Sequence, residues 1–246
     1  MAQERIAISI GGSILVPDNE DMSYIKQLAA TLLDMLPVYK FLVVCGGGKI
    51  ARYYITIGRS LGADESSLDE LGIEVTRLNA RLLITALGDK AYYKPAESVD
   101  EARLAANSYP IVVMGGTHPG QTTDAVAALA AEKIKATRLI NATSVDGVYT
   151  EDPKVNPNAK RIERMTFREL LDKVVYSKVE AGSSFIFDPL GAKLISRSKI
   201  QTAVVFGRDL QQLSNAIKGQ QFTGTLISSA PEAPSNPAPP SSSASR

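Results

Sequence analysis

Five short apolar runs recur along the chain, and longer segments with apolar residues at helical spacing lie between most of them. The runs are Ile6–Ile10, Phe41–Cys45, Ile111–Met114, Leu139–Ala142 and Ala203–Phe206. A continuous apolar run of this length is typical of a strand buried on both faces, as in a parallel sheet covered by helices. The pattern therefore predicts a largely parallel central sheet.

The intervening segments predict helices that cover this sheet. Apolar residues follow helical spacing in Met22–Leu36, Lys49–Leu61, Leu71–Leu87 and Asp124–Ile134. A further helix is predicted over Phe167–Val174, because Thr166 and Glu169 have the spacing of a capping box. Strands that alternate with helices in this way imply an α/β fold, a three-layer α/β/α sandwich.

Composition bounds the domain organisation. The chain has 246 residues, enough for one large α/β domain, which we expect over residues 1–229. From Ala230 the sequence turns to Pro, Ser and Ala, so residues 230–246 are predicted to be a disordered tail that buries too little apolar surface to order itself.

Charge and reactive side chains exclude several classes of protein. Lys and Arg total 27 against 26 acidic residues, which leaves no global field for nucleic acid or anionic lipid. One cysteine (Cys45) and one histidine (His118) exclude a Cys/His zinc site, and Cys45 is expected to be a buried thiol. No apolar run is long enough for a signal peptide or a membrane span, so a cytoplasmic location is expected.

Glycine clusters follow three of the predicted strands directly. They are Gly11-Gly12-Ser13, Gly46-Gly47-Gly48-Lys49 and Gly115-Gly116-Thr117. In an open α/β sheet, ligands bind beyond the carboxyl ends of the strands, where glycine lets backbone N–H groups approach phosphate oxygens. One such cluster is as readily a tight turn, but three together indicate a ligand with several phosphates.

Two common phosphate motifs can be tested at the glycine triplet. A Walker A loop fails, because Val43 and Ile50 stand where it needs a glycine and a hydroxyl residue. The spacing Gly46-x-Gly48-x-x-Ala51 does match a relaxed dinucleotide fingerprint. A nicotinamide-dependent oxidoreductase therefore remains an alternative, although it explains neither of the other glycine clusters.

Three polar segments follow later strands. In Gly115–Asp124, Thr123 is predicted to cap a helix that carries Asp124 in its first turn. In Thr143–Pro153, Tyr149 offers a ring and a hydroxyl for a nucleobase, unless the segment is only a turn. In Asp188–Lys193, a lysine in the first helical turn opposes the helix dipole, which a nearby phosphate would justify.

In this order, the motifs resemble the amino acid kinase family, and within it the archaeal-type UMP kinases. The matching segments are Ile10–Ser13, Val44–Arg52, Gly115–Ala128, Val145–Pro153, Asp188–Lys193 and Lys218–Ser228. The resemblance implies one domain that transfers phosphate from ATP, with Mg²⁺, to UMP in pyrimidine nucleotide synthesis. It implies a UMP half over about residues 1–135, an ATP half over about 136–229, and homohexamers built from dimers.

The resemblance also assigns residues, with Lys193 and Asp124 as the catalytic pair and no protein ligand to a metal. The expected ATP-binding residues are Gly12, Ser13, Gly48, Arg52, Thr143, Ser144, Tyr149 and Asp152. The expected UMP-binding residues are Gly47, Asp69, Thr117, His118, Pro119, Gly120, Gln121, Thr122 and Thr123. Asp69 is expected to be a buried acceptor for the ribose hydroxyls, and Lys49 is a further candidate cation.

The chain departs from the family pattern at Ser9, where many members carry a lysine that supports the transferring phosphoryl group. At the asparagine that usually precedes Val-Asp-Gly-Val-Tyr it has Ser144, a conservative exchange. Two proteins of the same fold but different activity are alternatives. An isopentenyl phosphate kinase would need a histidine within Lys49–Leu61, where none occurs. A non-catalytic oxyanion-storage protein would not need the acidic and lysine residues retained here.

Overall fold

A computed structural model describes residues 3–17, 23–151, 153, 155–177 and 187–229. Its main sheet has seven strands in the order β3-β2-β1-β4-β8-β9-β7. These strands are β1 (Glu4–Ile10), β2 (Tyr39–Cys45), β3 (Ile111–Met114), β4 (Arg138–Thr143), β7 (Arg164–Thr166), β8 (Gln201–Phe206) and β9 (Thr225–Ser228). A short antiparallel pair, β5 (Val148–Tyr149) and β6 (Arg161–Ile162), lies beside it.

Five of the strands run parallel and bring their carboxyl ends to one edge. At the centre, β1 pairs with β2 on one side and with β4 on the other, so that Ser9 stands between Val44 and Asn141. Strand β9 runs antiparallel to β8, with Thr225 opposite Val204. Successive strands are added on one side of β1 as far as β3 and then on its other side from β4 onward. An open α/β sheet binds its ligands where the strand order reverses in this way.

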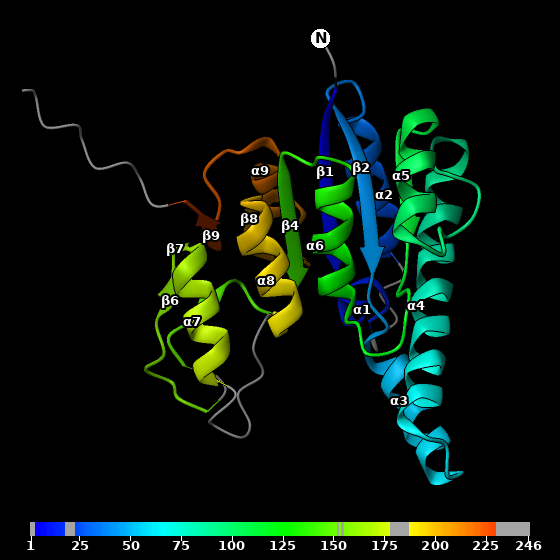
Figure 1. The fold of residues 1–246 in the computed structure, drawn as a ribbon. Coiled ribbons are helices and arrows are strands. Elements are labelled where there is room, and N and C mark those ends of the chain that lie inside the picture. The colour runs from blue at the N-terminus through cyan, green and yellow to red at the C-terminus, as the bar shows by residue number, and fades with distance from the viewer. Residues whose placement is uncertain (1–2, 18–22, 152, 154, 178–186, 230–246) are drawn as a thin grey trace, which may run out of the picture.

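Helices cover both faces of the sheet, as Figure 1 shows. Their bounds are α1 (Gly12–Leu15), α2 (Ser23–Asp34), α3 (Gly48–Ser60), α4 (Glu65–Leu87), η1 (Gly88–Lys90), α5 (Val99–Ser108), α6 (Thr123–Lys133), α7 (Phe167–Ser177), α8 (Pro189–Ser198) and α9 (Leu210–Lys218). One apolar core lies under α5, α6, α7 and α8, and the other under α1, α2, α4 and α9. This is the predicted α/β/α sandwich. No helix in the described part of the chain is long and apolar enough to cross a membrane.

All five predicted strands are confirmed, and the predicted helices lie within a few residues of the observed ones with one exception. Helix α4 begins at Glu65 rather than near Leu71. Its first turns are polar because α3 and this end of α4 extend beyond the carboxyl edge, where there is no sheet to pack against (Figure 1). Met22 lies outside the described residues, and helices α5 and α9 were not predicted.

Two local predictions can be checked directly. The Thr166 N–H donates to the Glu169 carboxylate at 2.6 Å, and the Glu169 N–H donates to the Thr166 hydroxyl at 3.1 Å. The capping box is therefore confirmed. Cys45 is fully buried at the end of β2, and burial raises the pKa of its thiol to about 12. Such a thiol is unreactive.

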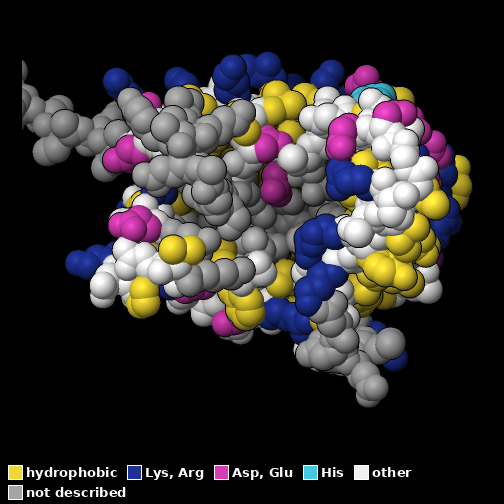
Figure 2. All heavy atoms as spheres, turned by 90° about the horizontal axis from the view of Figure 1, so that it is seen from below, with side chains coloured by type: hydrophobic (Ala, Val, Ile, Leu, Met, Phe, Trp, Pro, Cys, Tyr) yellow, Lys and Arg dark blue, Asp and Glu magenta, His cyan; other side chains and the backbone are white. Residues whose placement is uncertain are grey.

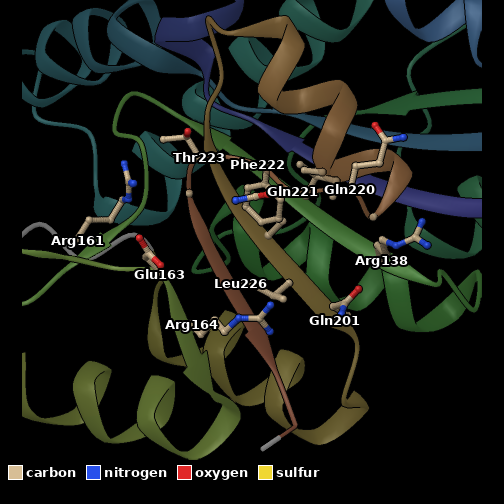
Figure 3. Close-up of a pocket in the computed structure, with 15 residues that line it drawn as sticks. Arg138, Arg161, Glu163, Arg164, Gln201, Gln220, Gln221, Phe222, Thr223 and Leu226 are labelled. Carbon is tan, nitrogen blue, oxygen red and sulfur yellow. The ribbon is translucent and has the colours of Figure 1, made fainter. Parts of the chain in front are cut away.

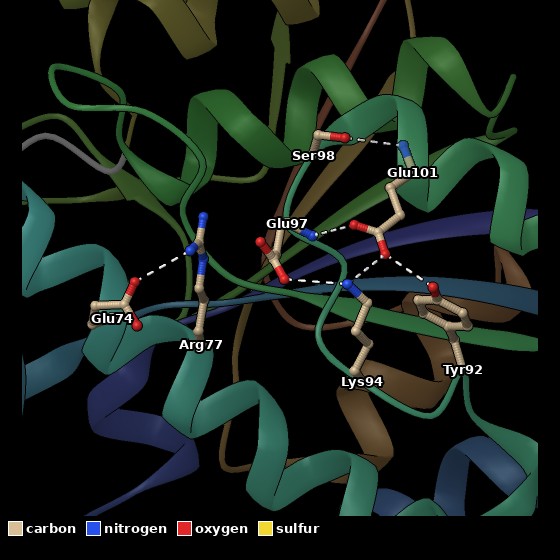
Figure 4. A network of polar contacts seen from close by, with 7 residues as sticks. All are labelled: Glu74, Arg77, Tyr92, Lys94, Glu97, Ser98 and Glu101. Atoms are coloured by element: carbon tan, nitrogen blue, oxygen red, sulfur yellow. Dashed lines mark hydrogen bonds and ion pairs between the residues drawn. The ribbon is translucent and has the colours of Figure 1, made fainter.

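The connection from α4 to α5 is fastened by a polar network (Figure 4). Glu101 accepts hydrogen bonds from the Tyr92 hydroxyl and the Glu97 N–H, both at 2.9 Å, and pairs with Lys94 at 3.1 Å. The Ser98 hydroxyl caps α5 by accepting from the Glu101 N–H at 3.1 Å. These contacts hold the segment that precedes β3, and so help to fix the position of the third glycine cluster.

Candidate active site

The carboxyl edge of the sheet carries all three glycine clusters. Figure 2 looks onto this edge, where a row of Lys and Arg side chains runs beside acidic side chains near the middle of the face. The Gly11 N–H donates to Ala142 O at 3.0 Å, and the Gly46 N–H donates to Ile10 O at 2.8 Å. The turn after β1 is thereby tied to β4, and the turn after β2 is tied to β1.

The first two clusters cross each other with backbone alone. A Cβ on Gly12 would lie 2.3 Å from the Gly48 nitrogen, and a Cβ on Gly48 would lie 2.5 Å from the Gly12 carbonyl carbon. Gly48 also has a φ of +65°, which L side chains rarely adopt. Helix α3 begins at this crossing with Gly47 as its N-cap, and no side chain caps its first N–H groups. Such an arrangement suits phosphate oxygens.

The third cluster has a different task. A Cβ on Gly115 would lie 2.3 Å from the Thr76 hydroxyl oxygen, which accepts the Gly116 N–H at 2.7 Å. Asn79, also on α4, donates its amide to Gly46 O at 2.8 Å. These two buried polar residues of α4 thus hold the second and third glycine turns by hydrogen bonds to their backbone. Neither residue was predicted, although polar residues within the apolar face of a long helix were the available signal.

The loop after the third cluster closes over itself and reaches α4. The Thr117 hydroxyl donates to the Gln121 side chain at 3.0 Å, and the Gly120 N–H donates to the Asp69 carboxylate at 2.7 Å. The structure thus brings Asp69 to the loop formed by Thr117, His118, Pro119, Gly120, Gln121, Thr122 and Thr123. Asp69 is exposed, however, so the expectation of a buried acceptor is wrong.

Two helix starts meet beside β1. The cap of α6 is Thr122, whose side chain accepts the Ala125 N–H at 3.2 Å, and the prediction of Thr123 as the cap is wrong by one residue. The Thr122 hydroxyl also donates to Asp188, the cap of α8, which accepts the Gly191 N–H at 2.5 Å. Asp124 and Asp188 are therefore held close together under the two helix N-termini.

Asp124 is anchored from the sheet. The Ser9 hydroxyl donates to Asp124 Oδ1 at 2.7 Å. Burial raises the pKa of Asp124 to about 6; the Ser9 hydrogen bond offsets part of this increase, and the charge of Asp188 adds a smaller increase. The position thus holds a carboxylate near its point of ionisation, which is typical of functional sites.

The segment after β4 forms a second polar group. The Tyr149 hydroxyl donates to Asp146 Oδ1 at 2.7 Å, and this bond is the main cause that raises the pKa of Tyr149. Arg161, on β6, pairs with the other Asp146 oxygen at 2.5 Å. Thr143 ends β4 and Ser144 is exposed just beyond it, while Asp152 lies outside the described residues. Asp146 and Arg161 were not predicted.

The predicted cations are spread over two helices. Lys193 is exposed and is the fifth residue of α8, just past the first turn in which it was expected. Lys49 and Arg52 are exposed on the first turns of α3, and Ser13 is half-buried in α1. In the described parts of the chain, no group of three or more His, Cys, Asp or Glu side chains could hold a metal ion.

Comparison with known proteins decides the family. Residues 4–205 match the model of the amino acid kinase family. The chain belongs to the amino acid kinase family. It is 49% identical over 224 residues to the uridylate kinase of Methanoculleus marisnigri, a match that covers 91% of this chain and 95% of that protein. It is 45% identical to the uridylate kinase of Thermococcus onnurineus, over 91% of this chain and 99% of that one.

Solved structures agree with the family assignment. The crystal structure of uridylate kinase from Archaeoglobus fulgidus has a TM-score of 0.81 at 42% identity and covers 92% of this chain and 100% of its own. UMP kinase from Ureaplasma parvum has a TM-score of 0.76 at 25% identity, over 93% of this chain. Similarity of this extent confirms the amino acid kinase fold across both halves of the chain.

Within this family, one buried residue beside Ser9 is unexplained by packing. Asn141 lies opposite Ser9 in the register of β4 and β1 and is 3% exposed. Its amide nitrogen has no hydrogen-bond partner among the described residues. A buried donor without a partner costs about 1–3 kcal/mol, so such groups usually face a ligand or a functional neighbour. The sequence signal was a polar residue inside an apolar strand.

Proposed function

We propose that the protein acts as a UMP kinase, which transfers the γ-phosphoryl group of ATP reversibly to UMP and gives UDP and ADP. The relatives named above support the choice of acceptor. The observation that carries it in this chain is the crossing of Gly12 and Gly48, flanked by a loop that Asp69 holds in place. Backbone donors for phosphates thus lie next to a polar loop suited to a second nucleotide.

The two halves divide the substrates between them. The UMP site comprises Gly47, Asp69 and the loop Thr117–Thr123, in the half that spans about residues 1–135. The ATP phosphates contact Gly12, Ser13, Gly48 and Arg52, while Thr143, Ser144, Tyr149 and Asp152 serve the base and ribose in the half that spans about residues 136–229. Support comes from the shared edge on which the described members of both sets lie.

The reaction needs positioning and charge neutralisation more than covalent chemistry. The acceptor oxygen of UMP is already anionic near neutral pH, so no general base is required. Lys193 stabilises the charge on the phosphoryl group. Asp124, close to the N-terminus of α8, orients Lys193. Since Ser9 replaces the lysine of many relatives, the site works with one fixed cation fewer.

Magnesium fits this site as an ion that arrives with ATP. Mg²⁺ prefers substrate phosphates and water, with one or two carboxylates, over a cage made wholly of protein ligands. Asp124 and Asp188 supply two carboxylates near the edge, and the described residues form no larger cluster. Asp124 and Asp188 would hold the ion, and when bound it would supply positive charge that neutralises the phosphates of ATP.

The active form is a homo-oligomer, a hexamer by family resemblance. Helices α3 and α4 expose large apolar side chains next to one another: Tyr53, Tyr54, Ile57, Leu61, Leu71, Leu78 and Leu82. Apolar patches of this kind mark interaction surfaces, and a second copy of this chain is the expected occupant. Size-exclusion chromatography with light scattering tests this, and a monomer at micromolar concentration would contradict it.

A coupled assay of ADP release tests the function. The purified protein is given ATP and Mg²⁺ with UMP, CMP, AMP, GMP or isopentenyl phosphate in turn. Turnover with UMP well above the others is the expected result. Activity with isopentenyl phosphate but not UMP would overturn the acceptor, and nicotinamide binding without ADP release would indicate an oxidoreductase.

A further inference from the structure

A pocket of about 490 Å³ lies away from the carboxyl edge. It is on the α9 face of the sheet, between β4, β8 and β9 and the segment that leads from α9 to β9. Two of its lining residues, Arg138 and Gln201, are the first residues of β4 and β8 and pair with each other in register. Since the phosphate-binding glycines follow the opposite ends of the strands, this pocket is separate from the candidate active site.

The pocket has arginines at opposite ends and a mixed polar and apolar lining between them. Figure 3 shows Arg138 and Arg161 on opposite sides, with the half-buried Phe222 between them. Ile140 and Leu226 line the same pocket. A volume of this size is within the range of sites for small organic ligands, about 300–1,000 Å³.

The arginines do not use all of their nitrogen atoms in contacts with described residues. Arg161 pairs with Asp146 through Nη1, and its Nε is buried without a partner among the described residues. Arg138 uses Nη1 for both Glu4 and Ile217 O, at 3.1 and 2.8 Å. Arg164 is exposed, and no described residue forms an ion pair or hydrogen bond with it.

The available groups have the chemistry of an anion site. Guanidinium groups recognise phosphate and carboxylate through pairs of parallel hydrogen bonds. Three arginines line the pocket against one carboxylate, that of Glu163, while Glu4 and Asp146 offset two of the arginines from outside. The two offset arginines are thereby fixed in place, while the side chain of Arg164 forms no ion pair with a described residue.

We propose that this pocket binds an elongated organic anion with negative groups at both ends, and that its occupancy alters the affinity for ATP. Sugar bisphosphates and tricarboxylates both belong to this class. The route to the ATP half is the chain of contacts from Arg161 to Asp146 and from Asp146 to Tyr149. A Cβ on Gly147 would lie 2.8 Å from Arg161 Cδ, so the same segment also packs directly on this arginine.

Isothermal titration tests the site with two probes, fructose 1,6-bisphosphate and citrate, in the absence of Mg²⁺. Saturable 1:1 binding of at least one probe is expected, and the probe that binds more tightly identifies the preferred anion. Arg164→Ala and Gln201→Glu should each weaken binding at least fivefold, since one removes a cation and the other adds a negative charge. Arg168→Ala, which removes an exposed arginine on α7 outside the pocket, should leave binding unchanged.

Kinetics test the coupling at constant free Mg²⁺. The bound probe is expected to change the KM for ATP at least twofold in the wild type and in Arg168→Ala, but not in Arg164→Ala. Absence of saturable binding by either probe would overturn the site, as would wild-type affinity in both pocket variants. Tight binding with an unchanged KM for ATP would overturn the coupling. Because binding is measured without turnover, the test of the site does not depend on UMP being the acceptor, whereas the test of the coupling rests on the proposed function.

Discussion

The hydroxyl of Ser9 donates a 2.7 Å hydrogen bond to the carboxylate of Asp124 at the position where many family members carry a lysine. In this chain a neutral hydroxyl group, and not a cation, therefore neighbours the Asp124 carboxylate from β1. Ser9→Ala should raise the pKa of Asp124 above about 6, because this hydrogen bond lowers it. We expect kcat to fall about threefold to tenfold at pH 6.5 and much less at pH 8, since a hydrogen bond to a charged group contributes about 1.5–3 kcal/mol.

The pH profile of kcat measures this effect. Ser214→Ala is the matched control, because it removes a buried serine hydroxyl that bonds Leu210 O on α9, far from the edge. A variant at Ser9 whose loss of kcat is the same at both pH values would show that the hydroxyl acts through packing alone.

Asp124 itself should make the ligand-free protein less stable at neutral pH. Its folded pKa of about 6 exceeds the usual value for aspartate, about 4. The folded state therefore binds the proton more tightly, and protonation stabilises it below pH 4; this contribution is lost as the pH rises through 6. Asp124→Asn should raise the free energy of unfolding by about 1 kcal/mol at pH 7.5, with a smaller gain at pH 5.

Thermal unfolding at the two pH values checks this sign. Asp172→Asn, on the exposed face of α7, should show no such difference between pH 5 and pH 7.5. If Asp124→Asn lowers the melting temperature equally at both, the carboxylate contributes to stability through its hydrogen bonds instead. Activity should be lost in Asp124→Asn in either case.

Lys193 is the strongest candidate for charge stabilisation in the transition state. Lys193→Ala should lower kcat by about 10²–10³, the scale for one preorganised contact, and change the KM values for UMP and ATP much less. Lys26→Ala, an exposed lysine on α2, is the control. A kcat within threefold of the wild type would move the role to Lys49, Arg52 or magnesium.

Gly48 and Gly62 allow the energetic cost of a left-handed backbone conformation to be separated from the cost of a steric collision. Gly48 and Gly62 have φ values of +65° and +85°, but a Cβ on Gly62 would meet nothing within 4 Å. Gly62→Ala should therefore cost only about 1 kcal/mol, the penalty for the conformation. Gly48→Ala adds the collision with Gly12 and should both destabilise the fold further and raise the KM for ATP. Chemical denaturation and kinetics on the pair decide; equal costs would contradict the crossing.

Asp69 is predicted to read the ribose of UMP with the carboxylate oxygen that does not bond Gly120. Since this residue is exposed, the preference for UMP over dUMP should be modest, about fivefold to tenfold, and Asp69→Asn should narrow it. Steady-state kinetics with both acceptors measure the ratio of kcat/KM. Equal use of UMP and dUMP by the wild type would remove the proposed role.

The strands of the sheet could be predicted from the sequence, but the hydrogen bonds that hold the glycine turns could not. Apolar runs such as Ile111–Met114 allow one interpretation, because each is too short for a helix and too apolar for a surface. By contrast, Thr76 and Asn79 serve glycine turns far away in the chain, and no local pattern indicates which carbonyl or N–H a helical side chain will meet. The position of Asn141 opposite Ser9, with its amide nitrogen unpaired among the described residues, likewise depends on the register of β4 against β1. The sequence of one strand does not specify that register.

Strand β1 belongs to both halves of the molecule at once. It is hydrogen-bonded along its length to β2, in the half proposed for UMP, and to β4, in the half proposed for ATP. Domain closure of the hinge type needs a few residues free to change their backbone angles between two bodies, and a shared strand offers none. The two halves are therefore joined through one continuous sheet, and the turns after β1 and β2 that are proposed to bind phosphate are tied to each other by the hydrogen bond from the Gly46 N–H to Ile10 O.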